Sequence, residues 1–213
     1  VLVRRNGSLA SALQYGAISR RRYDLVVTDA SMDPRLPVDM AAHGVSPAAF
    51  GSLMALNGIG CVVLQPLLAP RLGRAEAARA MAAGAALIGL GFGMNALRHS
   101  IPWYAAAVLV WTLGEVAYLP IASTVPAELA PAARRGRYQG AWSLSWALAF
   151  AVAPALGAAV LGRLGAGALW GGSLAAGLLV AAGQLATGPA RRRRIVALRA
   201  AAAAGADTAN RPD

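Results

Sequence analysis

The sequence has 213 residues, of which 57% are hydrophobic and only 14% are charged, and its mean hydropathy is +0.52. Soluble domains carry about 25% charged residues, so this composition excludes an ordinary water-soluble fold and indicates apolar surface that faces lipid. The net charge of +11 comes entirely from arginine, and the arginines stand in short clusters between long uncharged segments. We therefore expect them at a membrane surface, and we expect no nucleic-acid partner.

The first 47 residues are not predicted to form a regular membrane-spanning helix. A crossing in this region would have to bury the charged side chains of Asp24, Asp29, Asp33, Arg35 and Asp39. Each would cost about 2.5–3.5 kcal/mol at the centre of a bilayer. We therefore expect residues 1–47 to form an irregular N-terminal segment, a degraded or replaced helix. A translocated N-terminus is the alternative that stays open.

Five later segments each have the roughly 20 apolar residues that one helical crossing of a bilayer needs. They are residues 48–69, 80–97, 101–127, 138–162 and 164–190. Membrane strands are shorter, about ten residues, and alternate in character, so these segments are helices. The predicted fold class is all-α integral membrane, with a transmembrane helical bundle over residues 48–190. The bundle has five transmembrane helices, or six if part of the N-terminal segment also crosses.

Arginines alternate between dense and sparse in the connections between these segments. The dense connections hold Arg71, Arg74 and Arg79, then Arg134, Arg135 and Arg137, and finally Arg191 to Arg194, whereas Arg98 and Arg163 stand alone. Positively charged residues favour the cytoplasmic side of a membrane. We therefore expect a multi-pass protein of the cell (inner) membrane. Its C-terminal tail, residues 191–213, should lie in the cytoplasm as a short helix that frays.

Several short motifs resemble one family of transporters. The motifs are Leu36-Pro37-Val38-Asp39-Met40, His43-Gly44-Val45-Ser46, Phe50-Gly51, Leu56-Asn57-Gly58, Gly114-Glu115, Glu128-Leu129-Ala130-Pro131 and Arg135-Gly136-Arg137-Tyr138-Gln139-Gly140. They resemble the seventh-to-eighth and tenth-to-eleventh helix regions of bacterial drug/proton antiporters of the major facilitator superfamily. The resemblance extends from Leu36 to about Ala190. It implies the C-terminal half of that fold, in which each six-helix half repeats the other.

Two further motifs fit the second-half positions of this resemblance. Arg71, Gly73 and Arg74 match the loop motif G-x-x-x-D-R-x-G-R, although Pro66 and Pro70 replace its Gly and Asp. The loss of the Asp puts a charge-relay role for this copy in doubt. The segment Ala153-Pro154-Ala155-Leu156-Gly157 resembles a helix-bend element of the antiporters. There Pro154 would bend the helix and Gly157 would allow close approach of a neighbour. A plain Ala-rich helix with one proline explains the same residues equally well.

Glu115 is the one charged residue within the third apolar segment. Carboxylates at membrane depth usually face a cavity or a partner. Glu115 is therefore either a proton site or contact for a cationic substrate, or a locally paired residue that holds helices together. Trp111 and Tyr118, at i−4 and i+3, should share its face, and Tyr118 could donate a hydrogen bond to it. We expect this face to point toward the helices of a missing half, and to be open without them.

Other polar and aromatic residues within the apolar segments have structural and functional interpretations. Asn57 and Gln65 are eight positions apart, nearly on one helix face, and either form interhelical hydrogen bonds or line a substrate path. Trp142 and Trp146 follow a dense arginine connection and are expected to be interfacial anchors. The pattern Gly167-x-x-x-Gly171 predicts close helix packing, but only weakly in a chain with 24 glycines.

The chain shows no constellation typical of an enzyme. His43 and His99, its two histidines, are expected at the outer side without partners, and Cys61, its lone cysteine, cannot form an intrachain disulfide. No Cys/His metal spacing, phosphate-binding loop or nucleophile elbow is present. We therefore predict no catalytic residues, no metal and no cofactor.

The resemblance implies transmembrane transport, namely proton-coupled efflux of small organic solutes. The chain would be the C-terminal half of such a transporter and inactive alone, with the lipid bilayer and a missing N-terminal half or a second copy of itself as partners. The alternatives are a non-transporting helical membrane scaffold or subunit, and a decayed fragment. The substrate cannot be predicted from these residues.

Overall fold

The computed structural model describes residues 35–209, and within this range the chain is helical with no strands. The helices are α2 (Arg35–Ala42), α3 (Pro47–Leu72), α4 (Ala77–Gly93), α5 (Ile101–Leu129) and α6 (Arg135–Ala209), with short 3-10 turns at Met94–Ala96 and Ala132–Arg134. Four of these helices are long and apolar enough to cross a membrane. The predicted all-α membrane fold class is therefore confirmed. The expectation about residues 1–34 lies outside the described residues.

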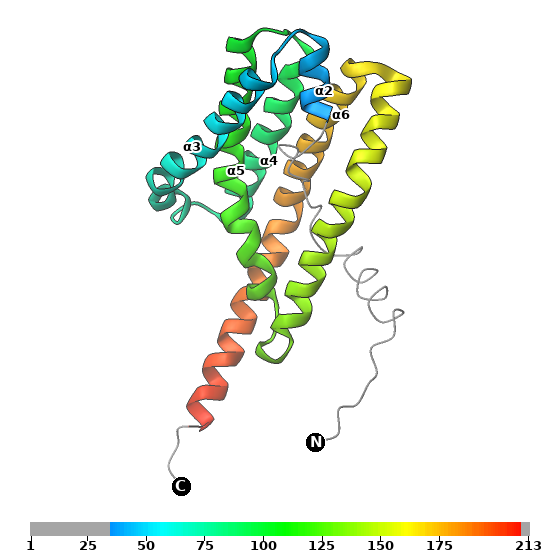
Figure 1. Ribbon diagram of the computed structural model, residues 1–213. Helices are drawn as coiled ribbons and strands as arrows, with labels where there is room; N and C mark the ends of the chain where they lie inside the picture. The colour runs from blue at the N-terminus through cyan, green and yellow to red at the C-terminus, as the bar shows by residue number, and fades with distance from the viewer. Residues whose placement is uncertain (1–34, 210–213) are drawn as a thin grey trace, which may run out of the picture.

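The longest helix, α6, consists of two antiparallel arms (Figure 1). Gly165 separates them with φ 81° and ψ 173°, a backbone conformation that is not helical and that is essentially restricted to glycine. We call residues 135–164 the first arm and residues 166–209 the second arm. Counting each arm separately, five helices of the described part have the length of a membrane crossing.

The second arm continues as a helix well beyond residue 190, where the apolar segment ends. The arginines at 191–194 end the apolar segment, but they do not end the helix, because alanine and arginine are both good helix formers. An ion pair between Arg199 Nη2 and Glu128 Oε1, at 2.9 Å, ties this extension to the end of α5. The predicted tail is thus a continuation of the last helix as far as Ala209.

Residues 35–42, inside the segment predicted to be irregular, form helix α2. Leu36 and Met40, one turn apart, are fully buried in the hydrophobic core. Asp39 counted against a helix in the sequence because of its charge, but its carboxylate Oδ2 accepts a hydrogen bond from the indole N–H of Trp170 at 3.1 Å. A specific donor thus accommodates the acidic side chain, and this part of the N-terminal segment packs as a helix.

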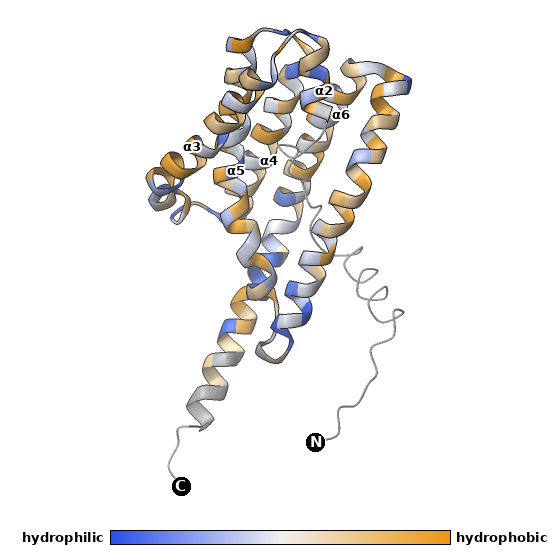
Figure 2. Cartoon of the chain, viewed as in Figure 1, coloured by the Kyte–Doolittle hydropathy of each residue, from blue (hydrophilic) through white to orange (hydrophobic). Residues whose placement is uncertain are grey.

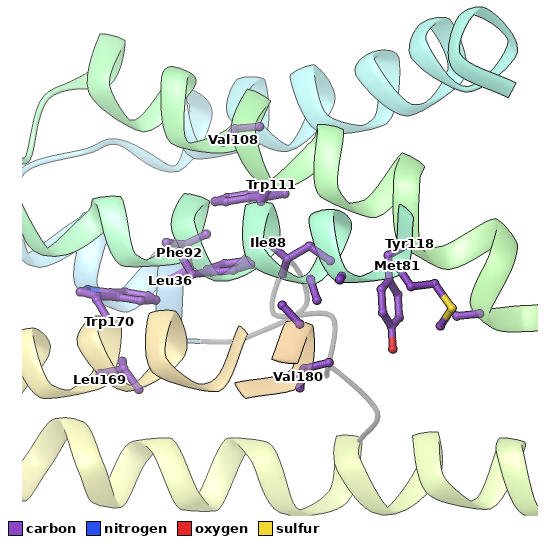
Figure 3. Packing of buried hydrophobic residues seen from close by; sticks show 14 of the residues in the cluster. Leu36, Met81, Ile88, Phe92, Val108, Trp111, Tyr118, Leu169, Trp170 and Val180 are labelled. Atoms are coloured by element: carbon purple, nitrogen blue, oxygen red, sulfur yellow. The ribbon is translucent and has the colours of Figure 1, made fainter. Parts of the chain in front are cut away.

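Helix α4 is the central helix of the bundle and packs between α5 and the second arm of α6 (Figure 3). Glycines bring its neighbours close on both sides. A Cβ added to Gly91 would lie 2.7 Å from the backbone N of Trp111 on α5, and one added to Gly89 would lie 2.9 Å from Cα of Gly177 on the second arm. Small residues at helix contacts are the usual means of close packing in lipid. Next to these glycines on α4, the ring of Phe92 stacks with the rings of Trp111 on α5 and Trp170 on the second arm.

Helix α3 and the first arm of α6 lie at the edges of the bundle and are largely exposed (Figures 1 and 2). In the most apolar window of α3 only 6% of residues are buried, against 56% in α4. Exposed side chains on these two helices are large and hydrophobic: Ile59, Val62, Val63 and Leu67 on α3, and Leu144, Leu148, Phe150, Val152 and Leu156 on the first arm. These faces are suited to lipid or to further apolar protein.

Candidate functional site

Glu115 lies halfway along α5 and is only 4% exposed. Its carboxylate Oε2 accepts a hydrogen bond from the side-chain amide of Asn57 on α3, at 2.8 Å, and the thiol of Cys61 lies 3.7 Å from the same oxygen. The charged residue in the middle of α5 is therefore held by donors from a neighbouring helix. The interaction joins α3 to α5 at membrane depth.

Asn57 uses its amide group twice. Besides its bond to Glu115, Nδ2 donates to the hydroxyl of Thr112 at 2.9 Å, and Thr112 in turn donates to the carbonyl of Val108 at 2.7 Å. Gly60 makes this geometry accessible, because a Cβ at that position would lie 2.9 Å from Cγ2 of Thr112. Asn57, Gly60 and Cys61 share the face of α3 that meets α5. We call Asn57, Cys61, Thr112 and Glu115 the carboxylate cluster.

A second polar chain begins one turn further along α5. The hydroxyl of Tyr118 accepts a hydrogen bond from Gln184 Nε2 at 3.4 Å, and Gln184 Oε1 accepts one from Arg191 Nη1 at 2.8 Å. Gln184 and Arg191 are each 2% exposed and lie on the second arm of α6. Helix α5 thus carries polar contacts to α3 on one side and to α6 on the other.

The face of α5 that holds Trp111, Glu115 and Tyr118 is closed in this structure, contrary to the expectation of an open face. Trp111 and Tyr118 are 0% and 1% exposed. The Trp111 ring stacks on Phe92 of α4 with centroids 4.5 Å apart, and the Tyr118 side chain packs against Gly84. Residues at i and i+7 lie almost directly above one another, so these two face α4. Glu115 lies about 40° around the helix from Trp111, on the side away from Tyr118, and it is turned toward α3.

Gln65 does not lie near the carboxylate cluster. Eight residues rotate a helix by about 80° beyond two full turns, so Asn57 and Gln65 point in different directions. Gln65 is exposed, whereas Asn57 is partly buried against α5. Of the two amides expected on nearly one helix face, only Asn57 takes part in the site.

The motif residues taken from the family resemblance lie outside the carboxylate cluster. Arg71, Gly73 and Arg74 are exposed at the end of α3, where the backbone N–H of Gly73 caps the helix by donating to Ala69 O. Pro154 is exposed within the first arm of α6, and Gly157 is buried. The helix break in α6 is at Gly165, close to the predicted boundary between residues 138–162 and 164–190, and the bend expected at Pro154 stays a prediction.

Aromatic residues form a ladder along the first arm. Trp142 and Trp146 make an edge-to-face contact at 5.9 Å, and Trp146 lies 5.7 Å from Phe150. Gly167 and Gly171 meet nothing within 4 Å that an added Cβ would touch, so the predicted packing pattern is not used within the described residues. The second arm, which carries both of these glycines, makes its close contacts with α4 at Gly177 and Gly188 instead.

The two histidines are not isolated from each other, so the expectation that each would lack a partner is wrong. Their rings stack with centroids 3.5 Å apart and planes 8° apart. His43 follows α2 and His99 lies in the connection before α5, and the fold brings these two connecting segments to the same end of the bundle. Their pairing depends on tertiary structure and leaves no local signal in the sequence.

Sequence reasoning missed Gln184 and Arg191 as members of a polar chain. The available signal is their spacing: seven positions put them on one helix face, and Gln184 is the only amide in the apolar part of the second arm. Arg191 was assigned to the solvated basic cluster with its neighbours at 192–194. The structure buries it in the bundle, where its guanidinium meets Gln184.

Chemically, the carboxylate cluster is a place where one proton can be bound or released among uncharged donors within an apolar bundle. Glu115 is its acid, Asn57 and Cys61 are donors, and Thr112 relays a hydrogen bond to the backbone. Among the described residues the cluster combines one acid with uncharged donors, and carboxylates at membrane depth usually belong to ion or proton pathways.

Comparison with known proteins identifies relatives of this chain. The family model of the Major Facilitator Superfamily matches residues 27–209. The uncharacterised MFS-type transporter YttB of Bacillus subtilis (strain 168) is 32% identical over 99 residues, which are 46% of this chain and 25% of the relative. The match thus spans about a quarter of the length of that curated relative. No solved structure matches the chain.

Proposed function

Because the chain belongs to the major facilitator superfamily, we propose that it is the C-terminal half of a proton-coupled transporter that exports small organic solutes. Transport and a multi-pass location in a membrane follow from the family. Proton coupling, the direction of transport and the class of solute are the proposed parts. No enzymatic role is part of the proposal.

The observation that carries the proposal is the carboxylate cluster. A glutamate at membrane depth is costly, and such residues usually belong to ion or proton pathways. Glu115 is bonded by Asn57 of α3, one of the two largely exposed helices, so a movement of α3 relative to α5 would change the donors around the carboxylate. Gain and loss of a proton at Glu115 would thereby be linked to helix movement, as proton coupling requires.

We further propose that a second six-helix half covers part of the exposed faces of α3 and the first arm. In major facilitator transporters the substrate lies between two halves that rock against each other. The apolar side chains along α3 and the first arm supply such a contact surface, and the remainder would face lipid. One half alone could not enclose a substrate between two halves and would therefore be inactive. A second copy of this chain is the alternative partner for the exposed faces of α3 and the first arm.

The orientation is proposed from the arginines. Connections α3–α4 and α5–α6 carry the dense clusters and lie toward one end of the bundle (Figure 1). The α4–α5 connection and the turn between the two arms of α6, whose sequences carry only Arg98 and Arg163, lie toward the other end. With the positively charged end inside, the C-terminus is cytoplasmic and the membrane is the cell (inner) membrane.

The proposal is tested by supplying the second half. The chain is co-expressed with the N-terminal half of the Bacillus subtilis relative, and the pair is reconstituted into proteoliposomes that contain a pH-sensitive dye. Addition of ethidium as a cationic probe should release protons across the membrane when both halves are present, and each half alone should give no signal. Co-purification of the two halves is measured first, so that a failure to assemble is recognised.

Substitution of the acid separates coupling from assembly. Glu115→Gln should abolish ethidium-driven proton movement while the halves still co-purify. Glu128→Gln, which removes an exposed carboxylate near the end of the same helix, is the matched control and should retain it. Assembled halves without any proton movement would refute the coupling, and full movement in Glu115→Gln would show that Glu115 is structural.

A further inference from the structure

Three side chains capable of binding a metal meet at the end of the bundle that is opposite the α5–α6 connection. They are Asp39 of α2, His43 in the turn after α2, and His99 in the connection before α5. One ligand atom of each lies within 4.8 Å of those of the other two. Asp39 is buried and His43 is partly exposed, with side chains 5% and 33% accessible. The cluster therefore combines one buried carboxylate with two imidazoles that are accessible to solvent.

We propose that Asp39, His43 and His99 form a binding site for one divalent transition-metal ion of the zinc type. Two imidazoles and a carboxylate are a donor set that zinc accepts, with water in the fourth position. The harder cations calcium and magnesium prefer oxygen ligands and would be poorly served by it. The carboxyl cluster around Glu115 takes no part in this site, and the proposal is independent of transport.

Each proposed ligand is oriented by a second group. His43 Nδ1 lies 2.8 Å from the backbone carbonyl of Asp39, which can only accept, so this nitrogen carries the proton and the other ring nitrogen has the lone pair. His99 Nδ1 lies 3.1 Å from the hydroxyl of Tyr104, and the carboxylate of Asp39 accepts from Trp170 Nε1 at 3.1 Å. Such outer partners are typical of metal-binding histidines and carboxylates.

Binding requires a modest adjustment of the imidazoles. Zinc–nitrogen bonds of about 2.0–2.1 Å put two ligand atoms of a tetrahedral site roughly 3.4 Å apart. The separations between the ligand atoms, which lie within 4.8 Å of one another, must therefore close by at most about 1.4 Å. The parallel rings must also tilt, because a metal lies in the plane of each imidazole that binds it. His43 and His99 stand in short connecting segments outside the helices, where such movement is least restricted.

The bound ion would link α2 to the connection between α4 and α5. It would also place a positive charge beside the buried carboxylate of Asp39, whose Oδ2 accepts a hydrogen bond from the indole N–H of Trp170 and whose Oδ1 lies 3.7 Å from His43 Nδ1. The result is a clamp at one end of the bundle that forms when metal is present. Its expected effect is to fix the position of α2 against the rest of the molecule.

The test is zinc binding by the purified full chain, measured by isothermal titration calorimetry in detergent micelles. The chain must carry an affinity tag without histidine, since its own two histidines are the only ones in the sequence. We expect saturation at one zinc per chain. Cobalt(II) as a spectroscopic probe should show the visible absorption bands of a tetrahedral site, a readout that does not depend on activity.

Variants distinguish this site from incidental binding. His43→Gln and His99→Gln should each weaken zinc binding at least tenfold, and the double variant should remove it. Trp170→Phe, which removes the donor to Asp39 but no ligand, should weaken binding by about 10–100-fold. Cys61→Ser is the matched control, because it removes the only thiol and should leave the affinity unchanged.

Two results would overturn the proposal. One is the absence of saturable zinc binding by the unsubstituted chain. The other is equal affinity and stoichiometry in the double histidine variant, provided that gel filtration and helical circular dichroism show both proteins folded. Loss of ethidium-driven proton movement in reconstituted halves has no bearing on either result, so the metal site and the transport proposal fail separately.

Discussion

At the scale of single residues, several buried or partly buried polar side chains form contacts that cross from one helix to the next. Asn57 reaches Glu115 and Thr112, and Gln184 reaches Tyr118. In an apolar surrounding the alternative to such a pair is a polar group without a partner, which costs more than the bond itself contributes. These few contacts therefore determine which faces of the helices meet.

The amide of Asn57 should contribute measurably to stability. Asn57→Leu removes one donor from the Glu115 carboxylate and one from the Thr112 hydroxyl, and we expect the free energy of unfolding to fall by about 1–3 kcal/mol. Gln65→Leu, an exposed amide on the same helix, is the control and should change it by less than about 0.5 kcal/mol. Both are measured by SDS titration in mixed micelles, and equal effects would contradict the role assigned to Asn57.

Sequence alone identified Glu115 and Asn57 as unusual, because each is polar within an apolar helix. It could not pair them, since the contact depends on the close approach of α3 at Gly60. The stacking of His43 on His99 was missed for the same reason: the two residues are distant in the chain and meet only in the folded molecule. The unusual residues could be identified from the sequence, but the contacts between them could not.

At the scale of helices, glycine positions decide the packing distance. The second arm approaches α4 at Gly177, where an added Cβ would lie 2.6 Å from Cα of Gly89. Backbone atoms cannot move aside as a flexible side chain can. This contact therefore tolerates very little additional volume.

Gly177→Ala should destabilise the bundle by about 1–3 kcal/mol, because the extra methyl group forces the two helices apart. Gly171→Ala lies on the same arm with nothing within 4 Å of the added Cβ, and it should be neutral or slightly stabilising. Thermal unfolding in detergent compares the two variants with the unsubstituted chain. A Gly177→Ala protein as stable as Gly171→Ala would mean that the arm does not pack closely on α4.

Hydropathy predicted the class of fold because lipid permits only helices or closed barrels to cross it. It could not predict α2, whose acidic Asp39 finds its donor on a distant helix, in Trp170. Nor could it predict how far the second arm extends, since a helix outside the bilayer requires helix-forming residues and not apolar ones. The sequence therefore failed to predict helical structure where it depends on a contact with a distant residue, as in α2, or where it lies outside the apolar segments, as in the end of the second arm.

At the scale of the whole molecule, the two ends of the bundle differ in charge. Arg134 and Arg192 are exposed at or beyond one end, and Arg98 is exposed at the other. In a Cys61→Ser background, Arg98→Cys should react with a membrane-impermeant thiol reagent on intact cells, whereas Arg134→Cys and Arg192→Cys should react only after the cells are opened. Arg191 is unsuitable because it is buried. Labelling of positions 134 and 192 from outside would reverse the proposed orientation.

The turn at Gly165 has a consequence for how the chain enters a membrane. The two arms are joined without any intervening loop, and of residues 138–190 only Arg163 is charged. A helical hairpin of this kind can be inserted as one unit, with its tip crossing the hydrocarbon while both base ends stay on the side of synthesis. The single guanidinium at the tip would cost about 2.5–3.5 kcal/mol at mid-membrane, which the apolar residues of two helices readily offset. Biogenesis of this region therefore depends on keeping the tip short and nearly uncharged, and an aspartate or arginine added beside Gly165 would impair insertion before it affected any contact in the finished fold.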